Sequence, residues 1–119
     1  SKEVYLSKQE KKFVSEVKEF VYKNVSFKCI ERLAEFNDCR EHGIKKDKKI
    51  KSIKDEEMKY FEVTKGCYDE YLDYIKCVKN IVDEVSSQKE IASVFHSKGG
   101  MSINMKQFKG LVMKDFELI

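Results

Sequence analysis

The four cysteines are the residues whose types and spacing could carry chemistry. They form two pairs, Cys29 with Cys39 and Cys67 with Cys77, and nine residues separate the members of each pair. Cysteine side chains form disulfides, bind zinc as thiolates, or stay buried as small apolar groups. Each chemistry needs different partners in space, so the elements that carry the cysteines decide among them.

Two antiparallel helices would place the cysteines for cross-linking. Ten residues advance an α-helix by about 15 Å, so two cysteines on one helix are too far apart to bond. In a supercoiled helix both still fall on one face, as an a position and a later d position. Equal spacing then brings Cys39 level with Cys67 and Cys29 level with Cys77. The sequence therefore predicts an all-α fold, an antiparallel helical hairpin stapled by disulfides Cys29–Cys77 and Cys39–Cys67.

Two other interpretations of the cysteines stay open at this point. Structural zinc sites usually use short Cys-x2–4-Cys spacings, and nine-residue gaps on helices orient the ligands poorly. Unrelated buried thiols in a cytosolic helical protein are the other alternative. Matched spacing favours disulfides over both, and disulfides indicate an oxidising compartment.

The residues between the cysteines repeat as well. Large side chains recur at the fourth position after the first cysteine (Leu33, Tyr71) and at the seventh (Phe36, Tyr74). Acidic residues recur at the second and sixth positions, as Glu31 with Asp69 and Glu35 with Asp73. An apolar i, i+4, i+7 pattern with acids on the other face is typical of an amphipathic helix.

This pattern resembles the twin Cys-x9-Cys, or coiled-coil-helix-coiled-coil-helix, family of the mitochondrial intermembrane space. The resemblance covers Cys29 to Cys77 and includes the aromatic residue three positions before the second cysteine of each box, Phe36 and Tyr74. The second box is also similar to one in cytochrome c oxidase subunit VIb. In that family the box precedes a further cysteine pair, whereas here it comes last.

The resemblance implies a structural accessory subunit of a respiratory-chain complex (cytochrome c oxidase or complex I), on the intermembrane-space side and peripheral to the inner membrane. Its partners would be other subunits of the complex and, during biogenesis, the oxidative import machinery. A free assembly factor or small chaperone of that space is the alternative. We expect no enzymatic activity, no cofactor and no bound metal, because the sequence lacks a Gly-rich phosphate loop, a catalytic triad context and a Cys-x-x-Cys motif.

Composition agrees with a small helical domain. The 119 residues contain no Pro and only 5 Gly, 38% are charged, and mean hydropathy is −0.57, so the core must be thin. Net charge is only +3, and Arg32 and Arg40 are the only arginines. Nucleic-acid readers depend on arginine, so we expect no nucleic-acid partner. The acids among the first twenty residues argue against a matrix-targeting presequence.

Three segments are expected along the chain. Residues 1–24 form an amphipathic helix, in which Ser7 and Glu10 make a capping box. Its apolar stripe is expected to pack within the chain, with docking on a partner subunit as the alternative. The stripe comprises Phe13, Val14, Val17, Phe20, Val21 and Val25. Residues 25–86 form the hairpin, with Gly43 ending its first helix, and a long second helix over residues 53–86 with a kink near Gly66. Residues 87–119 form an irregular C-terminal tail.

The C-terminal tail is expected to dock on another protein in preference to folding back. Met101, Ile103 and Met105 alternate, which predicts a short extended piece, and a short helix through Phe108 and Phe116 follows. Apolar residues at a terminus normally need cover.

Residues 45–54 are the most basic run of the sequence. They contain Lys45, Lys46, Lys48, Lys49, Lys51 and Lys54. We expect a solvated hairpin loop. The alternative is contact with an acidic partner, or with anionic lipid headgroups through Lys45, Lys46, Lys48, Lys49 and Lys51, where a lysine near the surface contributes about 1 kcal/mol.

Overall fold

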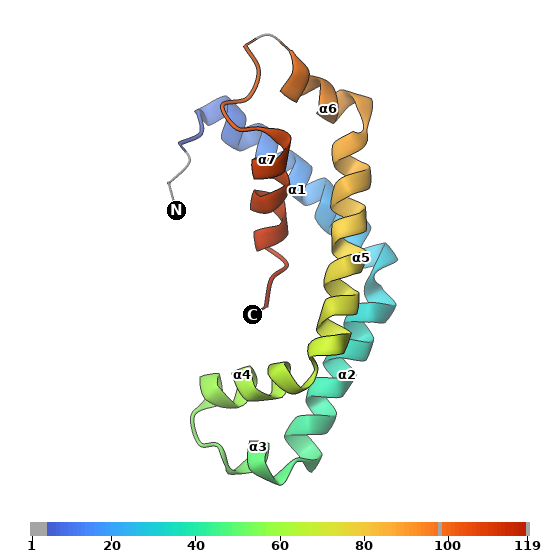
Figure 1. The fold of residues 1–119 in the computed structure, drawn as a ribbon, viewed down its shortest axis with the longest axis vertical. Coiled ribbons are helices and arrows are strands. Elements are labelled where there is room, and N and C mark those ends of the chain that lie inside the picture. The colour runs from blue at the N-terminus through green and yellow to red at the C-terminus, as the bar shows by residue number, and fades with distance from the viewer. Residues whose placement is uncertain (1–4, 98, 119) are drawn as a thin grey trace.

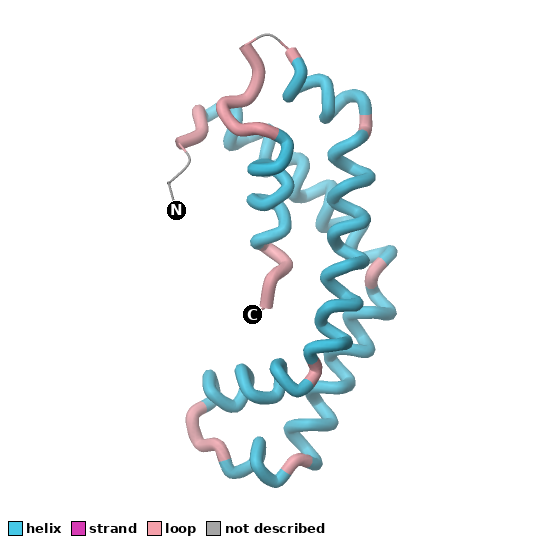
Figure 2. Tube along the Cα trace, viewed as in Figure 1, coloured by secondary structure: helices cyan, strands magenta, loops and turns pink. Residues whose placement is uncertain are grey.

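The computed structural model describes residues 5–97 and 99–118, and the regular structure in these ranges is entirely helical. The all-α prediction is confirmed. Figures 1 and 2 show a bowed, elongated molecule with principal extents of 58, 30 and 18 Å. Its helices are α1 (Lys8–Lys28), α2 (Ile30–Lys46), α3 (Lys48–Ser52), α4 (Glu56–Gly66), α5 (Tyr68–Ser87), α6 (Lys89–His96) and α7 (Met105–Lys114).

The centre of the molecule is the hairpin of α2 and α5, which run alongside each other in opposite directions (Figure 1). Helix α1 leads into α2 through a bend at Cys29, and α4 leads into α5 through a bend at Cys67. The long helix expected over residues 53–86 is therefore two helices. The kink expected near Gly66 falls at the next residue, Cys67, whose backbone φ of −109° leaves the helical range.

The N-terminal helix packs within the chain. Ser7 and Glu10 make the expected capping box, in which each side chain accepts a hydrogen bond from the other residue's backbone N–H. Four valines at helical spacing are buried against α5, namely Val14, Val17, Val21 and Val25. Phe20 instead lies outside this stripe and is 44% exposed. Helix α1 also continues to Lys28, four residues past the expected end of the N-terminal segment.

The C-terminal segment folds back onto α1 and α5. Helix α7 begins with a second capping box, between Asn104 and Gln107, and buries Phe108 and Val112 completely. The expected docking of this segment on another protein is therefore wrong for its apolar side chains Phe108, Val112 and Phe116, which fill the core of this chain. The cause is the wide apolar surface of α5, which has room for α7 as well as α1. The expected extended piece at Met101 is an irregular turn that leads into α7.

Buried side chains are distributed unevenly along the molecule. The large cluster lies where α1, α5 and α7 meet and contains fourteen buried residues, among them Val21, Val78 and Phe108. The small cluster lies between α2 and the start of α5 and contains only Phe36, Cys67 and Tyr71. Among the described residues, no helix combines the length and the apolar character needed to span a membrane.

Candidate functional site

Two disulfides join the helices in the pairing that the sequence predicts. Cys29 bonds to Cys77 and Cys39 bonds to Cys67, with Cα atoms 5.9 and 6.0 Å apart. All four cysteines of the sequence are therefore paired, and none is a free thiol. A zinc site would need all four sulfurs around one ion, but here they form two separate bonded pairs.

The Cys29–Cys77 disulfide borders the large cluster. Cys29 is 1% exposed and belongs to that cluster, while Cys77 is half-buried and packs against it. Because Cys29 also forms the bend between α1 and α2, this bond fixes three helices at one point. The disulfide lies at the large cluster and adds a covalent link between helices that apolar contacts already hold together.

The Cys39–Cys67 disulfide lies beside the small cluster. The rings of Phe36 and Tyr71 have their centroids 5.5 Å apart next to it. Arg40 follows Cys39 and places its guanidinium carbon 4.2 Å from the Phe36 centroid. The same guanidinium lies 4.9 Å from the Tyr60 centroid and donates a hydrogen bond to the Tyr60 hydroxyl, so Arg40 links α2 to α4.

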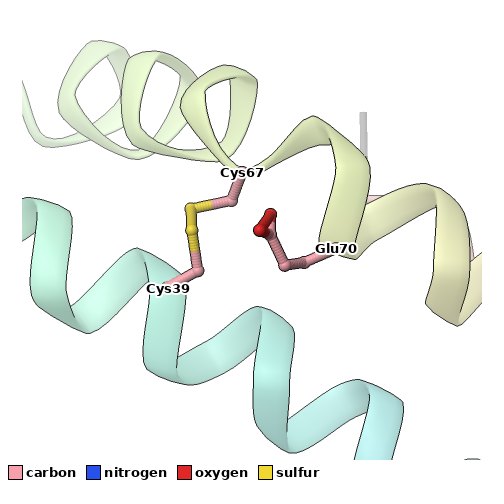
Figure 3. Close-up of side chains that lie close together, drawn as sticks. All are labelled: Cys39, Cys67 and Glu70. Carbon is pink, nitrogen blue, oxygen red and sulfur yellow. A yellow bond between two sulfur atoms is a disulfide. The ribbon is translucent and has the colours of Figure 1, made fainter.

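Glu70 is the side chain with metal-binding capacity beside this disulfide (Figure 3). A carboxylate oxygen of Glu70 and the sulfurs of Cys39 and Cys67 lie within 4.8 Å of one another. Figure 3 shows Glu70 projecting from α5 towards the bond between the two sulfurs. A bonded pair of sulfurs is not a pair of thiolate ligands, so the oxidised chain offers a cation one carboxylate here. This arrangement provides no metal site in the disulfide form.

The lysine-rich connection contains the short helix α3 in place of the expected loop. Helix α2 continues past Gly43 to Lys46, so Gly43 does not end the helix. A Cβ at Gly43 would lie 2.7 Å from the Cγ2 of Val63, which shows that the missing side chain lets α4 approach α2 closely. Asp47 then caps the short helix α3, and Ile50 is buried beneath it. We call residues 45–54 the lysine tip.

The lysines of the tip point into solvent. Lys45, Lys46, Lys48, Lys49, Lys51 and Lys54 are all exposed. Lys45 pairs with Glu41 at 2.7 Å, and this contact lowers the pKa of Glu41 and raises that of Lys45. The other five lysines form no ion pair with a described residue. The tip therefore carries largely uncompensated positive charge.

Several large apolar side chains outside the tip are exposed. On the bend between α1 and α2, Phe27 is 83% exposed and Ile30 is 60% exposed. Phe20 lies two helical turns before Phe27, on the same side of α1. These three side chains, which we call the bend patch, belong to neither buried cluster. Exposed apolar side chains that gather on one surface often mark a contact with a partner, and these three lie within eleven residues of the sequence.

A polar contact that the sequence analysis did not anticipate holds the C-terminal segment on α1. The Glu10 carboxylate accepts hydrogen bonds from the backbone N–H and the hydroxyl of Ser102, at 2.7 and 2.8 Å. These bonds, with those from Ser7, hold the pKa of Glu10 at about 2. At the other end of the tail, the Leu118 N–H donates to the Tyr71 hydroxyl. No local sequence pattern marks either contact, because each joins segments far apart in the chain.

No family model, no curated protein and no solved structure matches this chain. The disulfide framework and the bend patch are the features of this chain that bear on its function.

Proposed function

We propose that this chain is a structural accessory subunit of a mitochondrial respiratory-chain complex, cytochrome c oxidase or complex I, on the intermembrane-space side. The observation that carries the proposal is the pair of disulfides that cross-link two Cys-x9-Cys helices in antiparallel register. This framework is the one that the resembled family uses, and such bonds persist in an oxidising compartment. The role is binding, without catalysis, cofactor or resident metal.

The bend patch supports a role in which the chain is held by other subunits. Phe27 and Ile30 lie next to Cys29, so the disulfide fixes the backbone that presents them. Rigid apolar side chains lose little conformational entropy when they are buried against a partner. We propose that the bend patch contacts the neighbouring subunits, after the oxidative import machinery has formed the disulfides.

The alternative is a free assembly factor or small chaperone of the intermembrane space. Exposed apolar side chains away from the bend patch favour it, since Met58, Phe61 and Tyr68 are about half exposed. Such residues, dispersed over α4 and α5, suit transient contacts with clients.

Native gel electrophoresis of mitochondria that express a tagged chain tests the proposal. We expect the tag to co-migrate with a respiratory complex and to co-purify its subunits. The double substitution Phe27→Ser and Ile30→Ser should release the chain from the complex. The matched change Phe61→Ser and Tyr68→Ser, also at exposed apolar residues, should leave it bound. A small free pool with transient clients would instead support the assembly factor, and absence from mitochondria would overturn both.

A further inference from the structure

The net positive charge of the chain is concentrated in the lysine tip. Residues 45–54 contain six lysines and one acid, Asp47, so the segment carries a net charge of +5. The whole chain carries only +3, so all other residues together carry −2. The chain is therefore a weakly acidic body with a strongly basic tip, a separation that the total charge conceals.

The tip lies at one end of the long axis. In Figure 1 the long axis is vertical, with α3 at the bottom and the start of α1 near the opposite end. The molecule extends 58 Å along this axis, several times the Debye length of about 8 Å at physiological ionic strength. A charged surface that touches the tip therefore meets the +5 segment and its immediate neighbours, and salt screens the charges near the opposite end.

The tip has a fixed shape. Asp47 accepts hydrogen bonds from the backbone N–H groups of Lys49 and Ile50, and the Ile50 side chain is 8% exposed. The Cys39–Cys67 disulfide closes the base of the tip by joining the helices that enter and leave it. The lysines are thus presented from an ordered backbone, which lowers the entropy lost when they bind a surface.

The charges around these lysines leave most of them free. Glu41 pairs with Lys45, and Glu56 in the first turn of α4 lies 3.9 Å from Lys59. Asp47 and Asp55 use their carboxylates to cap helices. Glu57 is the remaining acid nearby, and it forms no ion pair with a described residue. All five acids keep their negative charge, so residues 41–59, which also contain seven lysines, carry a net charge of +2. The five lysines of the tip that form no ion pair with a described residue are Lys46, Lys48, Lys49, Lys51 and Lys54.

Exposed apolar side chains flank the tip in the sequence on both sides. Ile44 precedes Lys45 and is 41% exposed, while Met58 follows Lys54 by four residues and is 57% exposed. Basic side chains with apolar neighbours are the combination that an anionic membrane interface binds. The phosphate backbone of a nucleic acid offers no apolar region to an exposed isoleucine and methionine.

We propose that the lysine tip docks on an anionic phospholipid surface, with the long axis of the molecule pointing away from the membrane. The lysines provide electrostatic attraction to lipid phosphates, and Ile44 and Met58 enter the headgroup region. This inference goes beyond the proposed function and does not depend on it, because the tip would bind lipid whether or not the chain belongs to a complex.

Vesicle co-sedimentation of the oxidised full chain tests the proposal. We expect binding to vesicles of phosphatidylcholine and cardiolipin in equal amounts and none to pure phosphatidylcholine. The triple substitution Lys48→Glu, Lys49→Glu and Lys51→Glu should weaken binding at least ~100-fold, since each lysine near an anionic surface is worth roughly fivefold in affinity. Substituting Lys46 and Lys54 by Glu, outside α3, should weaken it at least ~25-fold.

The control variant makes the same change in charge at the opposite end of the molecule. Lys8, Lys11 and Lys12 are exposed near the start of α1, and their reversal to Glu should leave vesicle binding within about twofold. Circular dichroism and disulfide mapping establish that each variant keeps its fold.

Three outcomes would overturn the proposal. One is equal loss of binding in the tip and control variants, which would show dependence on net charge alone. Another is equal binding to both kinds of vesicle. The third is failure to bind vesicles together with tip-dependent binding to heparin or single-stranded DNA, which would identify the tip as a site for soluble polyanions. Weaker cardiolipin binding after Met58→Ser, at unchanged charge, would support the apolar contribution.

Discussion

The two ends of the hairpin use the same covalent bond in different surroundings. Around Cys29–Cys77, α1, α5 and α7 bury a cluster of fourteen residues. Around Cys39–Cys67, three buried residues form the whole cluster, and one of them is a cysteine of the bond. The first disulfide strengthens a core that apolar packing already holds together. The second disulfide supplies stability that an apolar core would otherwise give, because the short helices at the tip are too small to bury one.

This contrast explains which side chains each end of the molecule can expose without losing its fold. The end with the large cluster can expose the bend patch without losing its fold, because Val21, Val25 and Val78 remain buried beneath it. The tip can devote its surface to lysines, because its shape depends on a disulfide, one buried isoleucine and a helix cap. The predictions below separate the two ends, from the largest expected effect to the smallest.

Removing each disulfide in turn should have the largest effect, with a different extent of unfolding at each end. Loop entropy assigns about 4 kcal/mol to Cys29–Cys77, which spans 48 residues, and about 3.5 kcal/mol to Cys39–Cys67, which spans 28. We expect the double alanine variant of the first pair to lower hydrogen-exchange protection across α1, α2 and α5. The variant of the second pair should lose protection mainly in residues 39–67.

Urea unfolding of both variants gives the free energies, and amide hydrogen exchange gives the extent. Equal loss of protection throughout the molecule in both variants would contradict the division into a packed end and a cross-linked end.

Truncating the central aromatic residue of each cluster is expected to cost about 3 kcal/mol at either end. Phe108 is fully buried, with its ring centroid 5.0 Å from that of Phe95 and 6.0 Å from that of Phe13. Phe108→Ala should therefore release α7 and lower the stability of the whole molecule. Phe36 is equally buried but belongs to the small cluster and lies against Arg40, so Phe36→Ala should disorder α3 and α4 while α1 stays protected.

Urea unfolding and hydrogen exchange of these two variants measure whether the two clusters unfold separately. If Phe36→Ala unfolds α7 as readily as it unfolds α4, the two clusters are one cooperative unit.

The cysteine spacing allowed the central part of this fold to be predicted. Equal nine-residue gaps have one simple solution in an antiparallel hairpin, and the structure has that pairing. The capping box at Ser7 and Glu10 was equally accessible, because it joins residues three apart. Local patterns with fixed spacing therefore carried over directly from sequence to structure.

The position of the tail could not be predicted, because its partner surface lies in another part of the chain. A signal was present in α5, where Ile75, Val78, Ile81, Val82 and Val85 make an apolar surface too wide for one neighbouring helix. The prediction that Gly43 ends a helix was wrong for a different reason. A glycine near an expected helix end predicts a cap, but here it creates space for Val63 of another helix, which no local pattern shows.

The glycines on either side of the tip should respond in opposite ways to alanine. Gly43→Ala should cost about 1 to 2 kcal/mol, because its Cβ would meet the Cγ2 of Val63 at 2.7 Å. Gly66→Ala should stabilise the chain by about 0.5 kcal/mol, because a Cβ there has nothing within 4 Å and the residue is helical. Thermal unfolding monitored by circular dichroism measures both shifts, and an unchanged melting temperature for Gly43→Ala would show that α4 can move away from α2.

The smallest predicted effect is a loss of stability at low pH, and it arises at the packed end of the molecule. Glu10 has a pKa of about 2 in the folded chain against an ordinary value of 4.5, because Ser102 and Ser7 donate hydrogen bonds to its carboxylate. A depressed folded pKa contributes stability that is fully present above pH 4.5 and is lost as the pH falls towards about 2.

Glu10→Gln preserves a capping side chain but removes this charge. The melting temperatures of the two proteins should therefore differ most near neutral pH and converge as the pH falls to about 2, with the wild type higher. A constant difference at all pH values would show that Glu10 acts through its shape and not through its charge. The corresponding change next to the tip, Glu41→Gln in α2, removes an exposed ion pair with Lys45 and should leave the stability nearly unchanged, because surface ion pairs contribute little.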